Sequence, residues 1–452
     1  MLTCRLLQGD ELRRLGLFIA GVAWLAAAGA QARPSLDPPD VTAPGYASPT
    51  LEAYEAALMR GRLAVAAGLT RALQALSNGD AEAALAELNP AIEAAPDLAI
   101  AYDMRGEAWR LKGEFDKAEA DFGHVLAVDP SDVLALGGRG QVRAARGDLA
   151  GAAEDFSNAL AQKPESRWLH ELRGDVRLRS GDGKGALEDL LPLAAGAQDD
   201  PDIYEMLGRA WLLEGDAKRA LAALDQAVAL RPRAFVYFVR GVAQRALGDE
   251  AAAARDYEQA LALSPKFLAA LVARAELRAD AEDHAGAEAD FTAALAQQPE
   301  SAYLLRRRAA ERFGLADYDG ALADYDQALA RDPKDALAYG GRGAVWRVKG
   351  DSARAIADYD RAISLDPKAL PAVFNRGLLW LRLGQAAKAE TDFAAAIALR
   401  PAMAKAWYGR GVARLSLGAL KSGQSDIDHA TALDAEVGAL FQGFAPGRAA
   451  LR

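Results

Sequence analysis

The sequence predicts an all-α solenoid built from antiparallel helix pairs, and three observations lead to this prediction. Prolines recur at intervals of 34 residues or multiples of 34, with a single interval of 33 between Pro232 and Pro265. A fixed period of this length is typical of repeats that each pack only on their neighbours. Small and aromatic residues recur at fixed places within the period, and apolar residues make up 51 % of the chain, enough for a continuous core. The recurring prolines are Pro96, Pro130, Pro164, Pro232, Pro265, Pro299, Pro333, Pro367 and Pro401.

The first 32 residues are predicted to be a secretory signal peptide. Arg13 and Arg14 precede an apolar run at 15–28, and two overlapping small-x-small cleavage sites lie at 28–30 and 30–32. The run is shorter than the roughly 20 residues that a membrane-spanning helix needs. We therefore expect a periplasmic or secreted protein. The alternative is an uncleaved anchor, and only then would the chain contact a membrane.

The segments that follow differ in composition. Residues 33–50 are rich in Pro, Ser and Thr and predict a flexible linker, and residues 51–64 predict an amphipathic helix leading into the repeats. We expect repeat units 1–4 over 65–200 and units 5–11 over 201–435. The remaining residues, 436–452, carry apolar side chains that can cover the exposed face of the last unit, as terminal repeats require.

Each repeat unit is predicted to be two antiparallel helices joined by a tight turn. The pattern places Gly or Ala at the eighth place, Ala at the twentieth and an aromatic residue or Leu at the twenty-fourth, as in Gly140, Ala152 and Phe156. Small residues let two helix backbones approach, and the larger side chain fills the space between them. A Gly near the fifteenth place ends the first helix. The proline ends the second, because the residue before a proline is biased out of helical geometry.

Arg at the seventh place and Asp at the twenty-third place change together. Most units carry both, and the unit that lacks one lacks the other. Joint loss indicates that the two side chains touch, either within a unit or between units. We expect structural ion pairs, such as Arg308 with Asp324 and Arg342 with Asp358, rather than arginines awaiting an acidic ligand. Arg308→Leu should destabilise the fold, and adding Asp324→Ala should largely restore it.

The unit without this pair lies beside other irregularities. Leu207 and Ala223 replace the Arg and the Asp, and Gln198 replaces the proline that should end the unit before. Pro192 lies inside the preceding second helix, where a proline removes a backbone hydrogen bond. We expect a kink or hinge near residues 190–205.

These residues and spacings resemble the tetratricopeptide repeat family, with about eleven tandem 34-residue units over about four fifths of the chain. The resemblance implies a right-handed superhelix of helix pairs. It also implies a concave groove, lined by the first helix of each pair, that holds a protein or peptide segment.

In that architecture the second, fifth, ninth, twelfth and thirteenth places of each first helix should face the groove. Exposed aromatic residues there would be binding anchors; the alternative is that neighbouring helices cover many of them. The candidates in the middle and late units are Phe235, Phe238, Val242, Tyr303, Arg306, Phe313, Phe374 and Tyr408. The early units instead supply acidic residues, which suit a basic or neutral segment. They are Asp103, Glu107, Glu171, Asp175, Asp202 and Glu205.

Composition and motifs exclude several other classes of function. The net charge is −10 with a pI near 5.2, and no basic stripe is present, which argues against a nucleic-acid partner. The sequence contains no HExxH, GxxxxGK[ST] or GxSxG motif, so we expect no enzyme and no cofactor. The chain is therefore predicted to be an exported scaffold that binds a protein or peptide. The alternative is a glycan or cell-wall polymer stacked on Tyr303, Phe313 and Tyr408 in the same groove.

Overall fold

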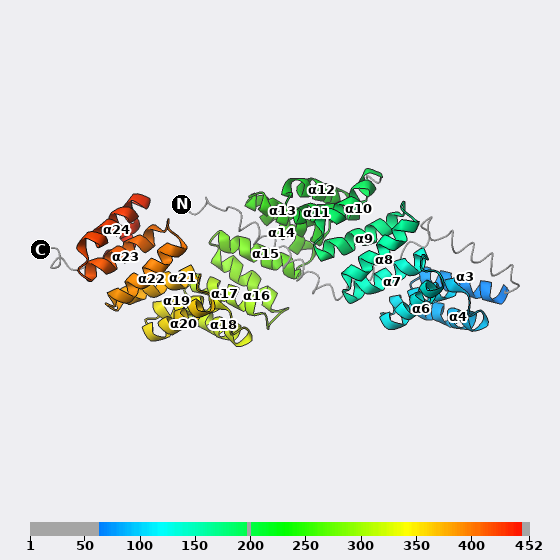
Figure 1. The fold of residues 1–452 in the computed structure, drawn as a ribbon, viewed down its shortest axis with the longest axis horizontal. Helices are drawn as coiled ribbons and strands as arrows, with labels where there is room; N and C mark the ends of the chain where they lie inside the picture. Colours follow the sequence, from blue (N-terminus) through cyan, green and yellow to red (C-terminus); the bar gives the residue numbers. More distant parts are fainter. Residues whose placement is uncertain (1–62, 197–199, 445–452) are drawn as a thin grey trace. The chain divides into compact units, whose positions relative to one another are not determined.

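The computed structural model describes residues 63–196 and 200–444. In these residues the chain contains 22 α-helices, α3 to α24, then one 3₁₀ helix, η1, and no strand (Figure 1). The predicted fold class, an all-α solenoid of antiparallel helix pairs, is confirmed. The predicted signal peptide, linker and most of the lead-in helix lie outside the described residues.

The helices form eleven consecutive pairs, matching the predicted number of units. The first six pairs are α3 (Leu63–Ser77) with α4 (Ala81–Ala94), α5 (Ala99–Leu111) with α6 (Phe115–Val128), α7 (Val133–Arg146) with α8 (Leu149–Gln162), α9 (Arg167–Ser180) with α10 (Gly183–Gly196), α11 (Pro201–Leu213) with α12 (Ala217–Leu230), and α13 (Ala234–Ala246) with α14 (Glu250–Leu263). The last five are α15 (Leu268–Asp280) with α16 (His284–Leu295), α17 (Ala302–Gly314) with α18 (Tyr318–Arg331), α19 (Ala336–Val348) with α20 (Ser352–Leu365), α21 (Leu370–Arg382) with α22 (Ala386–Leu399), and α23 (Ala404–Ser416) with α24 (Leu420–Leu433). The 3₁₀ helix η1 spans Val437–Phe444.

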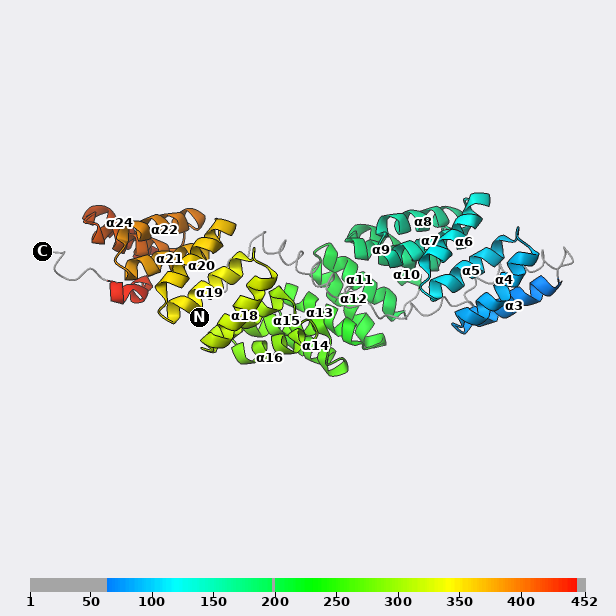
Figure 2. The same cartoon turned by 90° about the horizontal axis from the view of Figure 1, so that it is seen from below.

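The chain forms two compact units, Met1–Ala270 and Leu271–Arg452. Within each unit, neighbouring helices along the chain lie side by side, as α7 and α8 do in both views (Figure 2). None of the described helices is both long enough and apolar enough to span a membrane.

Close packing of a small residue of the first helix on a larger side chain of the second holds the pairs together, as the sequence predicts. Phe156 of α8 is fully buried, and a Cβ atom at Gly140 of α7 would lie 2.6 Å from its ring. Tyr257 and Gly241 repeat this arrangement in α13 and α14, again at 2.6 Å. The missing side chain at the eighth place therefore lets the backbone of the first helix rest directly on the ring of the second.

In most pairs the turn between the two helices is defined by a glycine and an aspartate. Gly147 ends α7 with a left-handed φ of +86°, which favours glycine. Asp148 then caps α8, its Oδ1 accepting a hydrogen bond of 2.9 Å from the backbone N–H of Gly151. Two pairs lack the glycine, and Glu282 and Ala316 take positive φ angles of 60° and 61° in its place.

The predicted hinge near residues 190–205 includes residues 197–199, which lie outside the described part of the chain. The helix α10 continues through Pro192 to Gly196, and α4 likewise continues through Pro90. A proline inside the second helix therefore does not end it in either pair. The hinge itself stays a prediction.

The helix η1 covers the last first helix, α23. Val437 and Phe441 are buried at 3 % and 2 % exposure, and the Phe441 ring stacks on Tyr408 with 4.9 Å between ring centroids. Leu440 of the same helix is 47 % exposed. The tail therefore covers the terminal apolar face through Val437 and Phe441.

Phe441→Asp is expected to lower solubility and increase the binding of a hydrophobic dye, because it would uncover the apolar side of α23. Leu440→Asp is the matched control and should leave both properties unchanged, since Leu440 is already exposed. Equal behaviour of the two variants in sedimentation and dye-binding assays would show that η1 does not act as a cap.

Candidate functional site

Within each unit the first helices of successive pairs contact one another and line one face. In the unit Met1–Ala270 the contacts join α3, α5, α7, α9, α11 and α13, and in the unit Leu271–Arg452 they join α17, α19, α21 and α23. Successive second helices make little such contact. This first-helix face is the surface on which the predicted binding residues are placed.

The seventh-place arginines are bound to the twenty-third-place aspartates of the same pair. Arg308 donates two hydrogen bonds of 2.8 Å, from Nε and Nη2, to the two carboxylate oxygens of Asp324. Arg342 binds Asp358 with the same geometry and the same distances. Both aspartates are buried. The contact therefore joins the two helices of one pair, not neighbouring pairs, and it occupies the arginines.

The two-bond contact recurs in the other pairs that carry both residues. It joins Arg105 with Asp121, Arg139 with Asp155, Arg173 with Asp189, Arg240 with Asp256, Arg274 with Asp290, Arg376 with Asp392, and Arg410 with Asp426. In the first pair, Arg71 and Glu87 form the same two-bond contact at a more exposed position.

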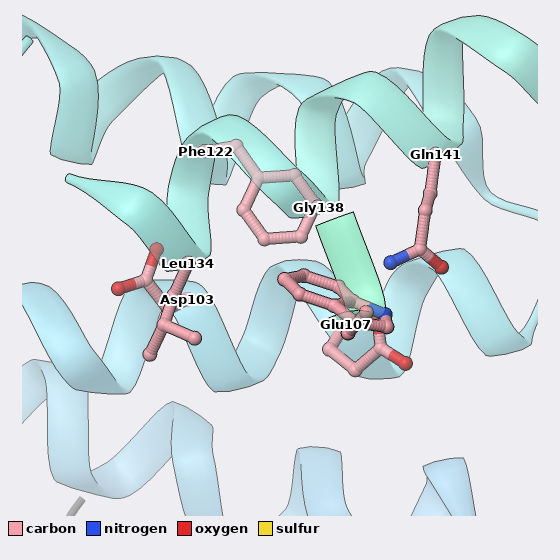
Figure 3. A pocket seen from close by; sticks show the side chains of 7 residues that line it. Asp103, Glu107, Phe122, Leu134, Gly138 and Gln141 are labelled. Carbon is pink, nitrogen blue, oxygen red and sulfur yellow. The ribbon is translucent and has the colours of Figure 1, made fainter. Parts of the chain in front are cut away.

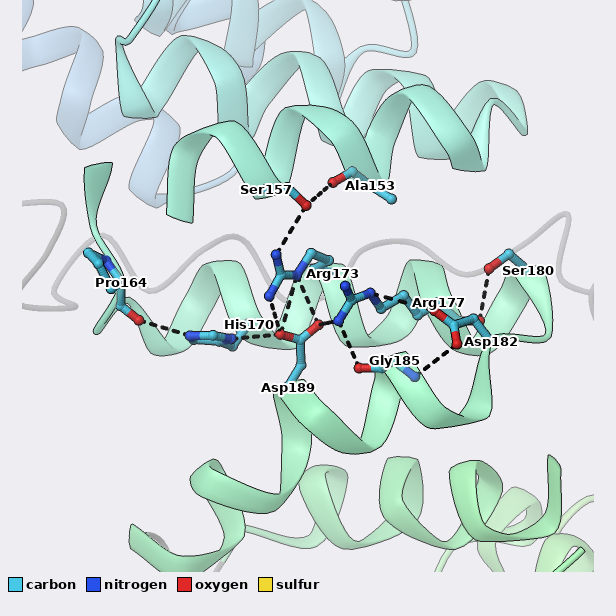
Figure 4. Close-up of polar contacts among 10 residues, drawn as sticks. All are labelled: Ala153, Ser157, Pro164, His170, Arg173, Arg177, Ser180, Asp182, Gly185 and Asp189. Carbon is cyan, nitrogen blue, oxygen red and sulfur yellow. Dashed lines mark hydrogen bonds and ion pairs between the residues drawn. The ribbon is translucent and has the colours of Figure 1, made fainter. Parts of the chain in front are cut away.

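In some pairs a second arginine, from the eleventh place of the first helix, also binds the buried aspartate. Arg177 Nη1 lies 2.7 Å from Asp189 and His170 Nδ1 lies 2.8 Å from it, so that this carboxylate has three side-chain partners (Figure 4). Arg312 adds a hydrogen bond of 3.0 Å to Asp324. The eleventh-place arginine was not part of the sequence prediction, although it recurs at a fixed spacing and could have been found there.

Two of the aromatic candidates are core residues rather than exposed anchors. Phe238 is 4 % exposed, and its ring lies edge-on to Phe267, with 5.2 Å between centroids, and near Tyr257. Phe374 is 9 % exposed and packs edge-on against Phe393. The expectation that Phe238 is an accessible anchor is therefore wrong, because Phe267, which precedes α15, closes over it.

The other candidates are half-buried, and most are engaged by a neighbouring side chain. Phe235 lies near Phe267 and Val242 is half-buried on the same helix, α13. The remaining four contact a specific partner: Tyr303 donates to Glu276, Arg306 forms an ion pair of 2.7 Å with Asp335, Phe313 packs on Tyr318, and Tyr408 stacks on Phe441. Burial, and then the charge of Glu276, raise the pKa of Tyr303. The three aromatic rings that a bound glycan would need are thus already in contact with protein.

Five of the six acidic candidates of the early pairs have an arginine partner in the described residues. These partners are Arg110 for Glu107, Arg167 for Glu171, Arg179 and Arg209 for Asp175, Arg231 and Arg233 for Asp202, and Arg233 for Glu205. The sixth, Asp103 of α5, is 6 % exposed, and its Oδ1 atom has no hydrogen-bond partner among the described residues. Burial, followed by the charges of Asp132 and Asp121, raises the pKa of Asp103 well above its usual value.

Asp103 lines a pocket on the first-helix face, between α5, α7 and α9 (Figure 3). The other lining residues are Glu107, Phe122, Leu134, Gly138, Gln141 and Trp168. Two adjacent glycines of α7 shape it, because a Cβ atom at Gly138 would clash with the Phe122 ring and one at Gly137 would clash with the Trp168 ring. In the described residues no group of three or more His, Cys, Asp or Glu side chains is arranged to hold a metal ion.

Sequence reasoning did not single out Trp168 or Gln141. Trp168 occupies the second place of its repeat and Gln141 the ninth, which are two of the places expected to face the groove. The positional rule would therefore have found both residues if it had been applied to every unit. What it could not reveal is that Asp103, unlike its acidic neighbours, has no partner in the part of the chain that the structure describes.

Comparisons with known proteins agree with the repeated architecture. Models of the tetratricopeptide repeat match residues 69–123, 112–167, 172–235, 234–267, 306–369 and 343–406. No curated protein shows a significant sequence match to the chain.

Several solved structures are similar. A tetratricopeptide repeat protein from Parabacteroides merdae ATCC 43184 is 21 % identical, with a TM-score of 0.40 over 52 % of this chain and 93 % of that chain. Yeast Tom70 is 17 % identical, with a TM-score of 0.38 over 84 % of this chain and 92 % of that one. YrrB, described as having an unusual peptide-binding site, is 23 % identical, with a TM-score of 0.37 over 41 % of this chain and 95 % of that chain.

The repeat models match more than half of the chain, and the helix pairs carry small residues and larger apolar or aromatic residues at the expected places. The chain therefore belongs to the tetratricopeptide repeat family.

Proposed function

We propose that the chain is an exported, non-enzymatic scaffold that binds a protein or peptide segment along its first-helix face. The observation that carries the proposal is the composition of this face from α5 to α11. It presents side chains of both charges in a series of ion pairs, together with a pocket whose buried Asp103 carboxyl group has no partner among the described residues. Such a mixture of charged, polar and aromatic groups suits the varied chemistry of a polypeptide.

Site-specific photo-crosslinking tests the proposal. A photoreactive residue at Gln141 of α7 lies on the first-helix face, whereas one at the exposed Asn158 of α8 lies on a second helix and is the matched control. Irradiation in an envelope extract should give protease-sensitive adducts from position 141 and few from position 158. Equal yields from both positions, or adducts that resist protease and contain carbohydrate, would contradict polypeptide binding at this face.

Export is tested separately by producing the chain in a bacterial host and determining its N-terminal residue and the cell fraction that contains it. We expect a mature chain that begins at Gln31 or Arg33 in the periplasmic or secreted fraction. An intact N-terminus in the cytosolic fraction would contradict export without affecting the binding proposal.

A further inference from the structure

The carboxyl group of Asp103 is buried, and no other described residue gives it the partner that such a group normally requires. Burying an unpaired polar or charged group costs free energy, so buried carboxylates are usually paired or hydrogen-bonded. Asp103 is 6 % exposed, and its Oδ1 accepts no hydrogen bond from the described residues. The other five acidic residues at equivalent places have arginines, so the lack of a partner is specific to this site.

The charges around Asp103 favour a cation. Glu107 on the same helix is neutralised by Arg110 through contacts of 2.6 and 2.7 Å, and Asp121 is held by Arg105. Asp132 caps α7 and accepts from two backbone N–H groups. The negative charges of Asp121 and Asp132 act on Asp103, and no cation in the described residues pairs with it. A positively charged ligand at Asp103 would therefore meet a carboxyl group that no described side chain neutralises.

The walls of the pocket suit an aliphatic stem that ends in a cation. Leu134 and Trp168 are half-buried and leave part of their apolar surface open to the pocket. An ammonium group within about 6 Å of an indole ring is attracted to its π-face. A carboxyl group, an indole ring and a leucine side chain thus line one small space. A compact ammonium group suits a single unpaired carboxyl oxygen better than a planar guanidinium group, whose donors match a carboxylate in pairs.

We propose that the pocket between α5, α7 and α9 binds a lysine side chain of the bound polypeptide, with its ammonium group on Asp103 and its stem along Leu134 and Trp168. The inference rests on the proposed function only in assigning the lysine to a polypeptide. Beyond the proposed function, it assigns lysine as the residue type recognised here, and Asp103, Leu134 and Trp168 as the side chains that recognise it.

The test uses the chain labelled with 5-fluorotryptophan, with the Trp168 signal assigned from Trp168→Phe. N-acetyl-lysine methylamide should shift this signal, and N-acetyl-norleucine methylamide, which has the same stem without the charge, should need at least about tenfold more ligand. Asp103→Asn should weaken binding of the lysine probe by at least about tenfold. Glu154→Gln, an equal change of charge on the exposed side of α8, should leave the affinity unchanged.

Three results would overturn the lysine pocket: equal affinity for the norleucine probe, unchanged affinity in Asp103→Asn, or equally tight binding of N-acetyl-arginine methylamide. The melting temperature separates binding from a structural role. Because burial raises the pKa of Asp103, ionising it opposes folding, and this penalty grows as the pH rises toward and through the raised pKa. Asp103→Asn should therefore melt no lower than the wild-type chain at pH 7, and a lower melting temperature would mark Asp103 as a structural residue.

The failure of this inference differs from the failure of the proposed function. If polypeptide adducts form at position 141 and persist in Asp103→Asn, the polypeptide-binding face stands and the lysine pocket is overturned. If the lysine probe shifts Trp168 in an Asp103-dependent way but no polypeptide adduct forms, the pocket stands and the proposed function is contradicted.

Discussion

Replacing Arg342 by leucine is expected to lower the free energy of unfolding by about 3–5 kcal/mol, because it leaves a buried carboxylate without its partner. Asp358 is 6 % exposed and receives both of its side-chain hydrogen bonds from Arg342, at 2.8 Å each. Leucine fills part of the space but cannot donate a hydrogen bond. Urea denaturation, followed by far-ultraviolet circular dichroism, measures the loss.

Two further variants test the origin of this loss. Arg342→Leu combined with Asp358→Ala should recover most of the stability, since no charge is then left unpaired. Arg308→Leu should cost clearly less than Arg342→Leu, because Arg312 still donates to Asp324 at 3.0 Å. If the single and double Arg342 variants lost equal stability, the buried ion pair would not be the cause.

Phe156→Ala is expected to cost about 3–5 kcal/mol, the range for removing a fully buried aromatic side chain from a core. The Phe156 ring has no exposed surface and packs on the backbone at Gly140, so the helices cannot easily move together to close the cavity. The same denaturation measurement gives this value.

Val128→Ala is the control for this substitution, because Val128 ends α6 with 78 % of its surface exposed. We expect a change of less than about 0.5 kcal/mol. A comparable loss in both variants would mean that the glycine–aromatic contact does not hold the pair together.

The repeat and its internal contacts could be predicted from the sequence because they are periodic. The proline spacing, the small eighth place and the joint loss of charge at Leu207 and Ala223 each report a feature that recurs in most units. The sequence could not settle whether arginine and aspartate meet within a pair or between pairs. The geometry of Arg308 with Asp324 places the contact within the pair.

The state of individual residues on the first-helix face depends on contacts that are not periodic. Phe238 is buried because Phe267, from the segment that precedes the next repeat, lies against its ring. Arg306 is neutralised by Asp335 of the following repeat. The place of a residue in the repeat gives the direction of its side chain, whereas its accessibility is decided by neighbours that differ from unit to unit.

Hydrogen exchange of Phe156→Ala tests most directly whether each helix pair is supported by its immediate neighbours alone. If the chain is such an array, backbone protection should fall in α7 and α8 and in the adjoining helices α6 and α9, while α13 and α14 keep the protection of the wild-type chain. Protection lost to the same extent from α3 through α14 would instead reveal a single cooperative core, and would contradict the solenoid on which the proposed binding face depends.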